Sequence, residues 1–254
     1  IAPEFTSEAT FSAAENQTAI GTVTATDAED DAITFTVSGS ELAITSAGVL
    51  TFTSEPDYET KATYKATVTA NDGINSTRKD ITVNVTNIND NPPELPFDSD
   101  NSSLYSFTID ENQTLVGSMT ATDADGDELT YSLSNYNGTE DASLILISNT
   151  GILSLKTAGD YETQTGYYVA VTVTNETFSD SQNVLININN NNDESPVFTS
   201  SEIFSAVENQ TEVGSNPSMM PDLEVTDADA AFADGITNIV TFSVSGNELA
   251  VTQD

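Results

Sequence analysis

The chain has 254 residues, of which 41 are Asp or Glu and only 5 are Lys or Arg, so its formal net charge is −36. Such a chain repels polyanions, which excludes nucleic acid and anionic membrane as partners and favours cations. There is no Cys, which excludes disulfides and thiolate metal sites, and apolar residues make up 37% of the chain in short runs, which indicates folded cores rather than disorder.

Short segments that alternate apolar with polar residues predict β-strands. In chain order they are residues 20–25, 33–37, 49–53, 64–70 and 81–85, and the same series returns at 115–121, 129–133, 152–155, 167–173 and 184–188. No segment has a sustained helical stripe, and none is long and apolar enough to insert into a membrane. The pattern predicts antiparallel β-sandwiches.

The sequence Glu-Asn-Gln-Thr begins at residues 15, 111 and 208, so the spacing is 96 and 97 residues. This spacing is the size of a domain and too long for a solenoid unit. It predicts three tandem domains, at residues 1–92, 93–196 and 197–254, the third being an N-terminal half whose folding the sequence leaves open. We expect the chain to be a piece of a longer array, with a polar insertion at residues 134–143 of the second repeat.

Four acidic motifs recur in a fixed order: Glu-Asn, a Thr-Asp-Ala run, Asp-Tyr-Glu and an Asn/Asp-rich linker at residues 87–93 and 190–196. This ordered set resembles cadherin repeats, most like the tandem cadherin-like domains of bacterial surface adhesins. The resemblance implies an all-β fold of seven-stranded Greek-key, Ig-like sandwiches with calcium ions, usually three, at each junction between repeats. Calcium prefers the hard oxygen ligands that these motifs supply.

The resemblance also implies which residues bind calcium. At the first junction they are Glu15, Asp57, Glu59, Asn89, Asp90, Asn91, Asp123 and Asp125. At the second they are Glu111, Asp160, Glu162, Asn192, Asp193, Glu194, Asp227 and Asp229, with Glu194 in place of the family's Asn. Apart from Glu194, which we expect to act through its main-chain carbonyl, each set contains six carboxylates that match the charge of three calcium ions and repel one another without them.

Some positions depart from the family pattern. Asn87 and Asn190 replace an Asp, and Asn175 replaces the acid that the first repeat keeps as Asp72. We expect Asn175 still to be a ligand, but fewer charged ligands weaken calcium binding, so two or three ions at the first junction stay open. Asp27 and Asp72 are assigned to a junction upstream, and Asp127 to a turn.

The leading functional hypothesis is a calcium-binding, non-catalytic adhesion or extender segment, located outside the cell or on its surface. Its expected partners are calcium ions, neighbouring repeats, and a protein or polysaccharide bound on another surface. The alternative is a calcium-dependent carbohydrate-binding module that stacks sugars on Tyr136, Tyr167 or Tyr168. An enzyme is not favoured, because the carboxylates come in equivalent sets and no unique pair stands out.

Overall fold

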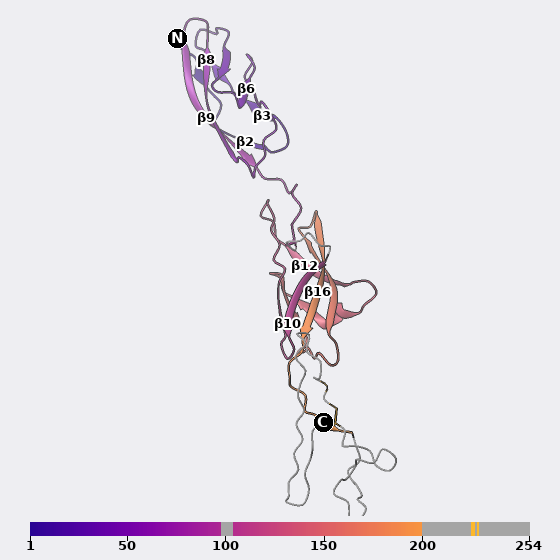
Figure 1. Ribbon diagram of the computed structural model, residues 1–254. Helices are drawn as coiled ribbons and strands as arrows, with labels where there is room; N and C mark the ends of the chain where they lie inside the picture. Colours follow the sequence, from indigo (N-terminus) through magenta and orange to yellow (C-terminus); the bar gives the residue numbers. More distant parts are fainter. Residues whose placement is uncertain (98–103, 200–224, 227, 229–254) are drawn as a thin grey trace, which may run out of the picture. The chain divides into compact units, whose positions relative to one another are not determined.

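The computed structural model describes residues 1–97, 104–199, 225, 226 and 228 (Figure 1). The chain divides into two compact units, each described here by itself. The first consists of Ile1–Pro93 with two short segments, Thr122–Glu128 and Asn175–Phe178. The second consists of the other described residues.

The first unit is a sandwich of two sheets. A four-stranded sheet has the order β2 (Thr10–Ala14), β9 (Ser76–Thr86), β8 (Thr63–Asn71), β5 (Thr34–Val37). A three-stranded sheet has the order β3 (Ala19–Thr22), β7 (Val49–Phe52), β6 (Leu42–Ile44), and β1 (Glu4–Phe5) pairs with β4 (Ala25–Thr26). Strand β2 runs parallel to β9, and the other neighbours within these sheets are antiparallel.

The second unit repeats this arrangement. Its four-stranded sheet has the order β10 (Leu104–Asp110), β16 (Ser179–Asn189), β15 (Gly166–Thr174), β12 (Thr130–Asn135). Its three-stranded sheet has the order β11 (Leu115–Ser118), β14 (Ile152–Leu155), β13 (Ile145–Ile147). Strands β17 (Val197–Phe198) and β18 (Val225–Thr226) pair with each other and follow these strands in the chain, within the residues that the sequence assigns to a third repeat. Four strands and three strands face each other in both units, which confirms the predicted fold class.

Each sandwich encloses its own apolar core, built by strands with alternating burial. In β9, Ile81, Val83 and Val85 are buried while the residues between them are not. This alternation is what a sheet with one face on the core requires. The pattern of the sequence does not predict β2, β6, β10 or β13.

The predicted polar insertion of the second repeat is an ordered element. It contains a turn at Asn137 and Gly138, both with positive φ, and a 3-10 helix, η1 (Asp141–Leu144). Asp141 is buried, and its carboxylate accepts hydrogen bonds from the Tyr168 N–H (2.8 Å) and from Gln164 Nε2 (3.1 Å). These bonds hold the insertion against β15.

The glycine that precedes β7 lies close to the backbone that follows β3, the neighbouring strand of the same sheet. Gly48 has a φ of +87°, and its carbonyl accepts a hydrogen bond of 2.8 Å from the Val23 N–H. A Cβ added at Gly48 would lie 2.2 Å from the Val23 carbonyl oxygen. Gly151 has the same role beside Met119 in the second unit.

Replacing Gly48 with alanine should therefore destabilise the first unit through both strain and a clash. Gly39 is a matched control, because its φ is +84° and no atom lies within 4 Å of an added Cβ. We expect Gly39→Ala to cost about 1–2 kcal/mol, the penalty for a left-handed alanine, and Gly48→Ala at least twice as much. Urea unfolding of both variants measures the difference, and equal losses would contradict the predicted clash.

Candidate metal centres

A buried glutamate ends the first strand of each four-stranded sheet. Glu15 follows β2 and is 1% exposed. Its Oε2 accepts a hydrogen bond from the Tyr58 N–H (2.8 Å) and its Oε1 accepts one from the Ile88 N–H (2.7 Å). These donors offset the cost of burying the carboxylate and fix its orientation. Glu111 has the same surroundings in the second unit, with the N–H groups of Tyr161 and Asn191 as donors.

The asparagine that follows each glutamate orients the linker aspartate. Asn16 and Asn112 have φ angles of 59° and 65°, a left-handed conformation that Asn tolerates better than most residues. Asn16 Nδ2 donates to the Asp90 carboxylate, and Asn112 Nδ2 donates to that of Asp193. The sequence analysis assigned no role to either asparagine, although their recurrence in the repeated tetrapeptide was a signal.

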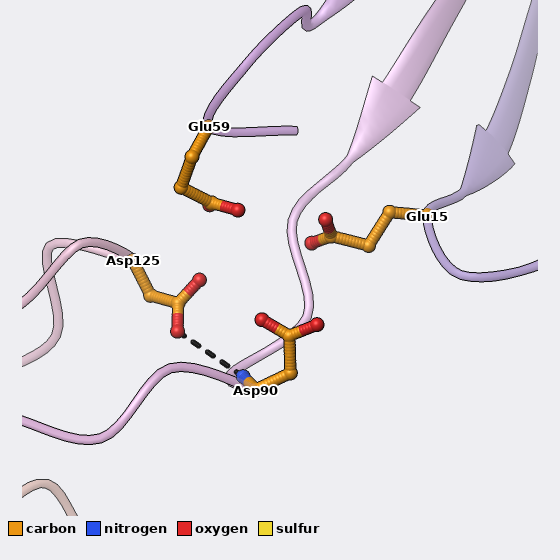
Figure 2. Close-up of side chains that lie close together, drawn as sticks. All are labelled: Glu15, Glu59, Asp90 and Asp125. Carbon is orange, nitrogen blue, oxygen red and sulfur yellow. Dashed lines mark hydrogen bonds between the residues drawn. The ribbon is translucent and has the colours of Figure 1, made fainter. Parts of the chain in front are cut away.

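Four carboxylates converge in the first unit, and we call them the first cluster: Glu15, Glu59, Asp90 and Asp125. One oxygen from each lies within 4.8 Å of the others. Figure 2 shows the four side chains directed toward a common space. The linker holds Asp125 in place, because the N–H groups of Asp90 (3.1 Å) and Asn91 (2.8 Å) donate to its Oδ2.

The first cluster has no basic partner among the described residues. The two ion pairs among the described residues lie outside the cluster and join Ile1 to Glu29 and Lys61 to Glu41. Like charges at this separation repel by about 1 kcal/mol per pair in water, and by more where water is partly excluded. The cluster is therefore a concentrated negative site.

Desolvation, neighbouring charges and hydrogen bonds shift the pKa values of two carboxyl groups in the first cluster. Desolvation raises the pKa of Glu59, and the carboxylates of Asp125 and Glu15 raise it further. Desolvation also acts to raise the pKa of Asp125, but hydrogen bonds, chiefly from Asn91, outweigh it, so this pKa is lowered. Of these two carboxylates, Glu59 therefore takes up a proton before Asp125.

A second cluster lies in the second unit and consists of Glu111, Glu162 and Asp193, again with one oxygen each within 4.8 Å. Asn190 Nδ2 donates to Glu162 Oε1 (3.3 Å), and Asn190 Oδ1 is buried with no partner among the described residues. Four of the other predicted ligands of the second junction follow β16 in the chain. Asn192 and Glu194 are exposed in the segment after β16, and Asp227 and Asp229 lie outside the described residues.

The aspartates of the two Asp-Tyr-Glu motifs do not join either cluster within the described part of the chain. The Asp57 carboxylate accepts hydrogen bonds from the Thr60 N–H (3.0 Å) and hydroxyl (2.9 Å), and Asp160 does the same with Thr163. These bonds lower the pKa of both aspartates. Each caps a turn in this structure, and its predicted role as a ligand stays a prediction.

A third group consists of Asp123, Asp125 and Asp127, and it shares Asp125 with the first cluster. The sequence assigned Asp127 to a turn, yet its carboxylate lies among the other two. Desolvation raises the pKa of Asp127, as do the charges of Asp123 and Asp125. Of the predicted ligands, Asn91 donates to Asp125 and Asn175 donates to Asp123, while Asn89 contacts Asn175.

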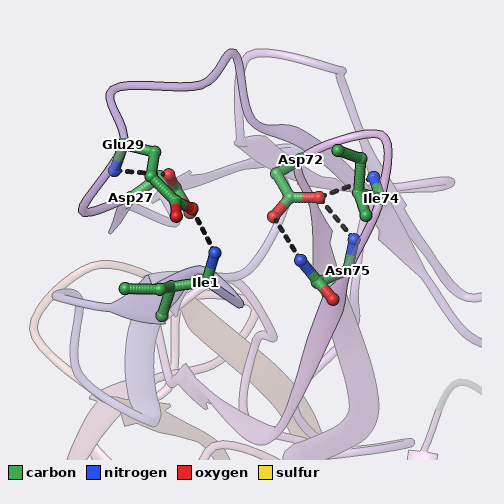
Figure 3. A network of polar contacts seen from close by, with 6 residues as sticks. All are labelled: Ile1, Asp27, Glu29, Asp72, Ile74 and Asn75. Atoms are coloured by element: carbon green, nitrogen blue, oxygen red, sulfur yellow. Dashed lines mark hydrogen bonds and ion pairs between the residues drawn. The ribbon is translucent and has the colours of Figure 1, made fainter.

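A fourth group, Asp27, Glu29 and Asp31, lies in the first unit, and Asp27 Oδ2 is buried without a partner among the described residues. Figure 3 shows Asp27 and Glu29 beside the α-ammonium group of Ile1, which pairs with Glu29. Asp72 belongs to the same network of polar contacts. The assignment of Asp27 and Asp72 to an upstream junction stays a prediction.

The donor set of the first cluster fits calcium. Calcium binds six to eight oxygens at about 2.3–2.6 Å, so oxygens on opposite sides of one ion lie about 5 Å apart. Oxygens that all lie within 4.8 Å of one another, as in this cluster, are close enough to contact one such ion. The chain has no His and no Cys, which are the usual zinc ligands.

Removing one charge from the first cluster should stabilise the calcium-free protein. Because the folded-state pKa of Glu59 is raised, calcium-free protein should lose stability as the pH rises through that pKa. Glu59→Gln lacks this loss, so it should melt at a higher temperature than the parent chain at neutral pH.

Thermal melts in calcium-free buffer between about pH 4 and 7 measure this effect, since the range spans the usual pKa of Glu. Glu55→Gln is the control, because it makes the same charge change at an exposed residue outside the clusters. A Glu59→Gln protein that melts no higher than the control would contradict the predicted repulsion.

The chain is similar in sequence to several cadherins. No family model matches the chain. The chain is 30% identical to mouse Protocadherin Fat 4 over 210 residues and 30% identical to human Protocadherin Fat 4 over 241 residues, which is 80% and 89% of its length. It spans only 4% of the length of either relative. Mouse Cadherin-24 is 37% identical over 103 residues, which is 37% of the chain and 12% of that protein.

Solved cadherin structures have the same fold. Human CDH23 EC21-23 has a TM-score of 0.67 at 20% identity and covers 91% of the chain and 81% of its own length. Mouse Cadherin-23 EC22-24 has a TM-score of 0.63 at 24% identity and covers 89% of the chain and 78% of its own length. At these identities the structures establish the fold alone.

Within the described ranges, no helix has the length and hydropathy needed to cross a membrane. The cadherin relatives indicate an extracellular or cell-surface location. They do not bear on the predicted likeness to bacterial adhesins, which stays a prediction. The identity to Protocadherin Fat 4 over most of the chain shows that this chain belongs to the cadherin family, and the solved cadherin structures share its fold.

Proposed function

We propose that the chain is a calcium-binding, non-catalytic adhesion or extender segment in which bound calcium stiffens a tandem array. The observation that carries this proposal is the first cluster, in which four carboxylates converge with no basic partner among the described residues. Divalent cations would neutralise that charge, and hard oxygen donors are the ligands that calcium prefers.

The proposal gives the ions a mechanical role because of where the ligands lie along the chain. Asp125 belongs to a segment, Thr122–Glu128, that is grouped with the first unit but is joined covalently to β11 and β12 of the second. An ion held by Asp125 together with Glu15 would restrain the chain where it passes from one unit to the other. Without the ion, repulsion would favour separation of these residues.

The second cluster supports the same role, because its members occupy equivalent sequence positions. Glu111 corresponds to Glu15, and its carboxylate is oriented by backbone N–H groups in the same way. Asp193 corresponds to Asp90, and an asparagine contacts each. We propose that Asp227 and Asp229 complete this second site, and that residues 1–92, 93–196 and 197–254 are the successive repeats.

The alternative of a carbohydrate-binding module gains no support from the relatives. Tyr167 is 8% exposed and belongs to the core, so its ring faces are covered. Tyr136 and Tyr168 stack on each other, with ring centroids 6.4 Å apart at an interplanar angle of 25°. The relatives found are cadherins, which agrees with the predicted non-catalytic role.

Calcium titration by isothermal calorimetry tests the proposal. The parent chain should bind calcium, and Asp90→Asn should weaken the tightest binding about tenfold or more, because it removes one carboxylate of the first cluster. Glu55→Gln should bind as the parent does. Small-angle X-ray scattering on the same samples should show a narrower range of dimensions with calcium than with chelator.

Calorimetry tests whether calcium binds, and scattering tests whether bound calcium stiffens the chain. No calcium-dependent heat in the parent chain would overturn the whole proposal. Calcium binding that leaves the scattering unchanged would retain the site and reject its mechanical role.

A further inference from the structure

Asn175 lies in the turn between β15 and β16 and is 2% exposed. Its Oδ1 accepts hydrogen bonds from the N–H groups of Thr177 (3.3 Å) and Phe178 (2.9 Å). A backbone N–H can only donate, so the oxygen of the side-chain amide has to face these two groups. The orientation of the amide is therefore fixed, and its nitrogen points the other way.

The amide nitrogen of Asn175 lies in a cage of oxygens. Four acceptors surround Nδ2: Asp123 Oδ2 at 2.9 Å, the Asn91 carbonyl at 3.2 Å, Asn89 Oδ1 at 3.3 Å and Asp127 Oδ2 at 3.4 Å. A side-chain amide has only two protons to donate. Four oxygens, two of them from carboxylates, exceed the two that the amide can use, and they are of the kind that calcium binds.

The first repeat shows the same turn with an acid in this position. Asp72 Oδ1 accepts hydrogen bonds from the N–H groups of Ile74 (2.7 Å) and Asn75 (2.5 Å), two and three residues later, as Asn175 Oδ1 does (Figure 3). An Asp therefore keeps the turn and directs a second oxygen where Asn175 directs a nitrogen. The two turns therefore differ at one atom: Asp72 has a carboxylate oxygen that accepts hydrogen bonds, whereas Asn175 has an amide nitrogen that donates them.

We propose that the Asn175 amide takes the place of one calcium ion at the first junction. Calcium binds its oxygens at about 2.3–2.6 Å, so an ion cannot share this cage with a nitrogen that already lies against the same oxygens. The N–H groups also present partial positive charge to any cation. This inference rests on the proposed calcium binding, and it replaces the sequence-based expectation that Asn175 is itself a ligand.

The substitution has a consequence for the protein without calcium. The amide links the linker residues Asn89 and Asn91 to the carboxylates of Asp123 and Asp127 through hydrogen bonds that need no ion. In the first cluster, by contrast, four carboxylates face one another, and the backbone and asparagine groups that donate to them do not remove this repulsion. The junction thus combines a calcium-dependent site with a calcium-independent contact.

Asn175→Asp tests the inference, with calcium ions counted by calorimetry and native mass spectrometry. The variant should bind one more calcium ion per chain than the parent. In chelator it should melt at a lower temperature than the parent, because a third carboxylate then faces Asp123 and Asp127. The control is Asn137→Asp, the same change at an exposed turn residue, which should alter neither the count nor the melting temperature.

The outcomes separate this inference from the proposed function. A parent that binds calcium and a variant that binds no more overturn the role of Asn175 alone. If the parent binds no calcium and the variant binds one ion, the proposed function is wrong, but the result supports the inference that the Asn175 amide takes the place of an ion. If neither binds calcium, both fail.

A measurement on the parent chain covers the case of a variant that does not fold. The side-chain amide resonances of Asn175 should keep their positions in NMR spectra when calcium saturates the protein. A large shift, as expected if the amide turned to offer its oxygen to an ion, would overturn the inference.

Discussion

Repulsion among carboxylates that the fold holds together is the interaction on which this structure depends. Glu15 cannot move away, because it is buried and bonded to two backbone N–H groups. Asp90 and Asp125 are held by asparagine and main-chain donors. With only 5 basic residues in the chain, neutralisation has to come from outside. The fold therefore fixes where a cation is needed before any cation arrives.

Negative charge can be balanced by a bound ion or by a side-chain amide, and only the first of these depends on the calcium concentration. Under the proposed function, an ion balances the charge of the first cluster, so the strength of that contact would vary with calcium concentration. Around Asn175 the balance comes from an amide, a permanent part of the chain that needs no ligand. A single Asp-to-Asn difference between Asp72 and Asn175 thus changes the charge of otherwise similar turns and, under the two proposals above, their dependence on calcium.

The sequence predicted the fold class because strands such as β9 and β16 alternate strictly over many residues. It could not predict β6 and β13, which have three residues each and are too short to establish a period. The anchoring of the insertion by Asp141 was also inaccessible, since it depends on contacts with β15 that are distant in sequence. The grouping of Glu15 with Asp90 followed from recurring motifs, whereas the direction of the Asn175 amide required coordinates.

The most direct test is a crystal structure of the chain grown in calcium, with an anomalous difference map collected where calcium scatters anomalously. The account predicts a peak among Glu15, Glu59, Asp90 and Asp125, and no peak within bonding distance of both Asp123 and Asp127 beside Asn175. No peak in the first cluster would contradict the calcium site, and a peak in the cage with a displaced Asn175 amide would contradict the role given to that residue.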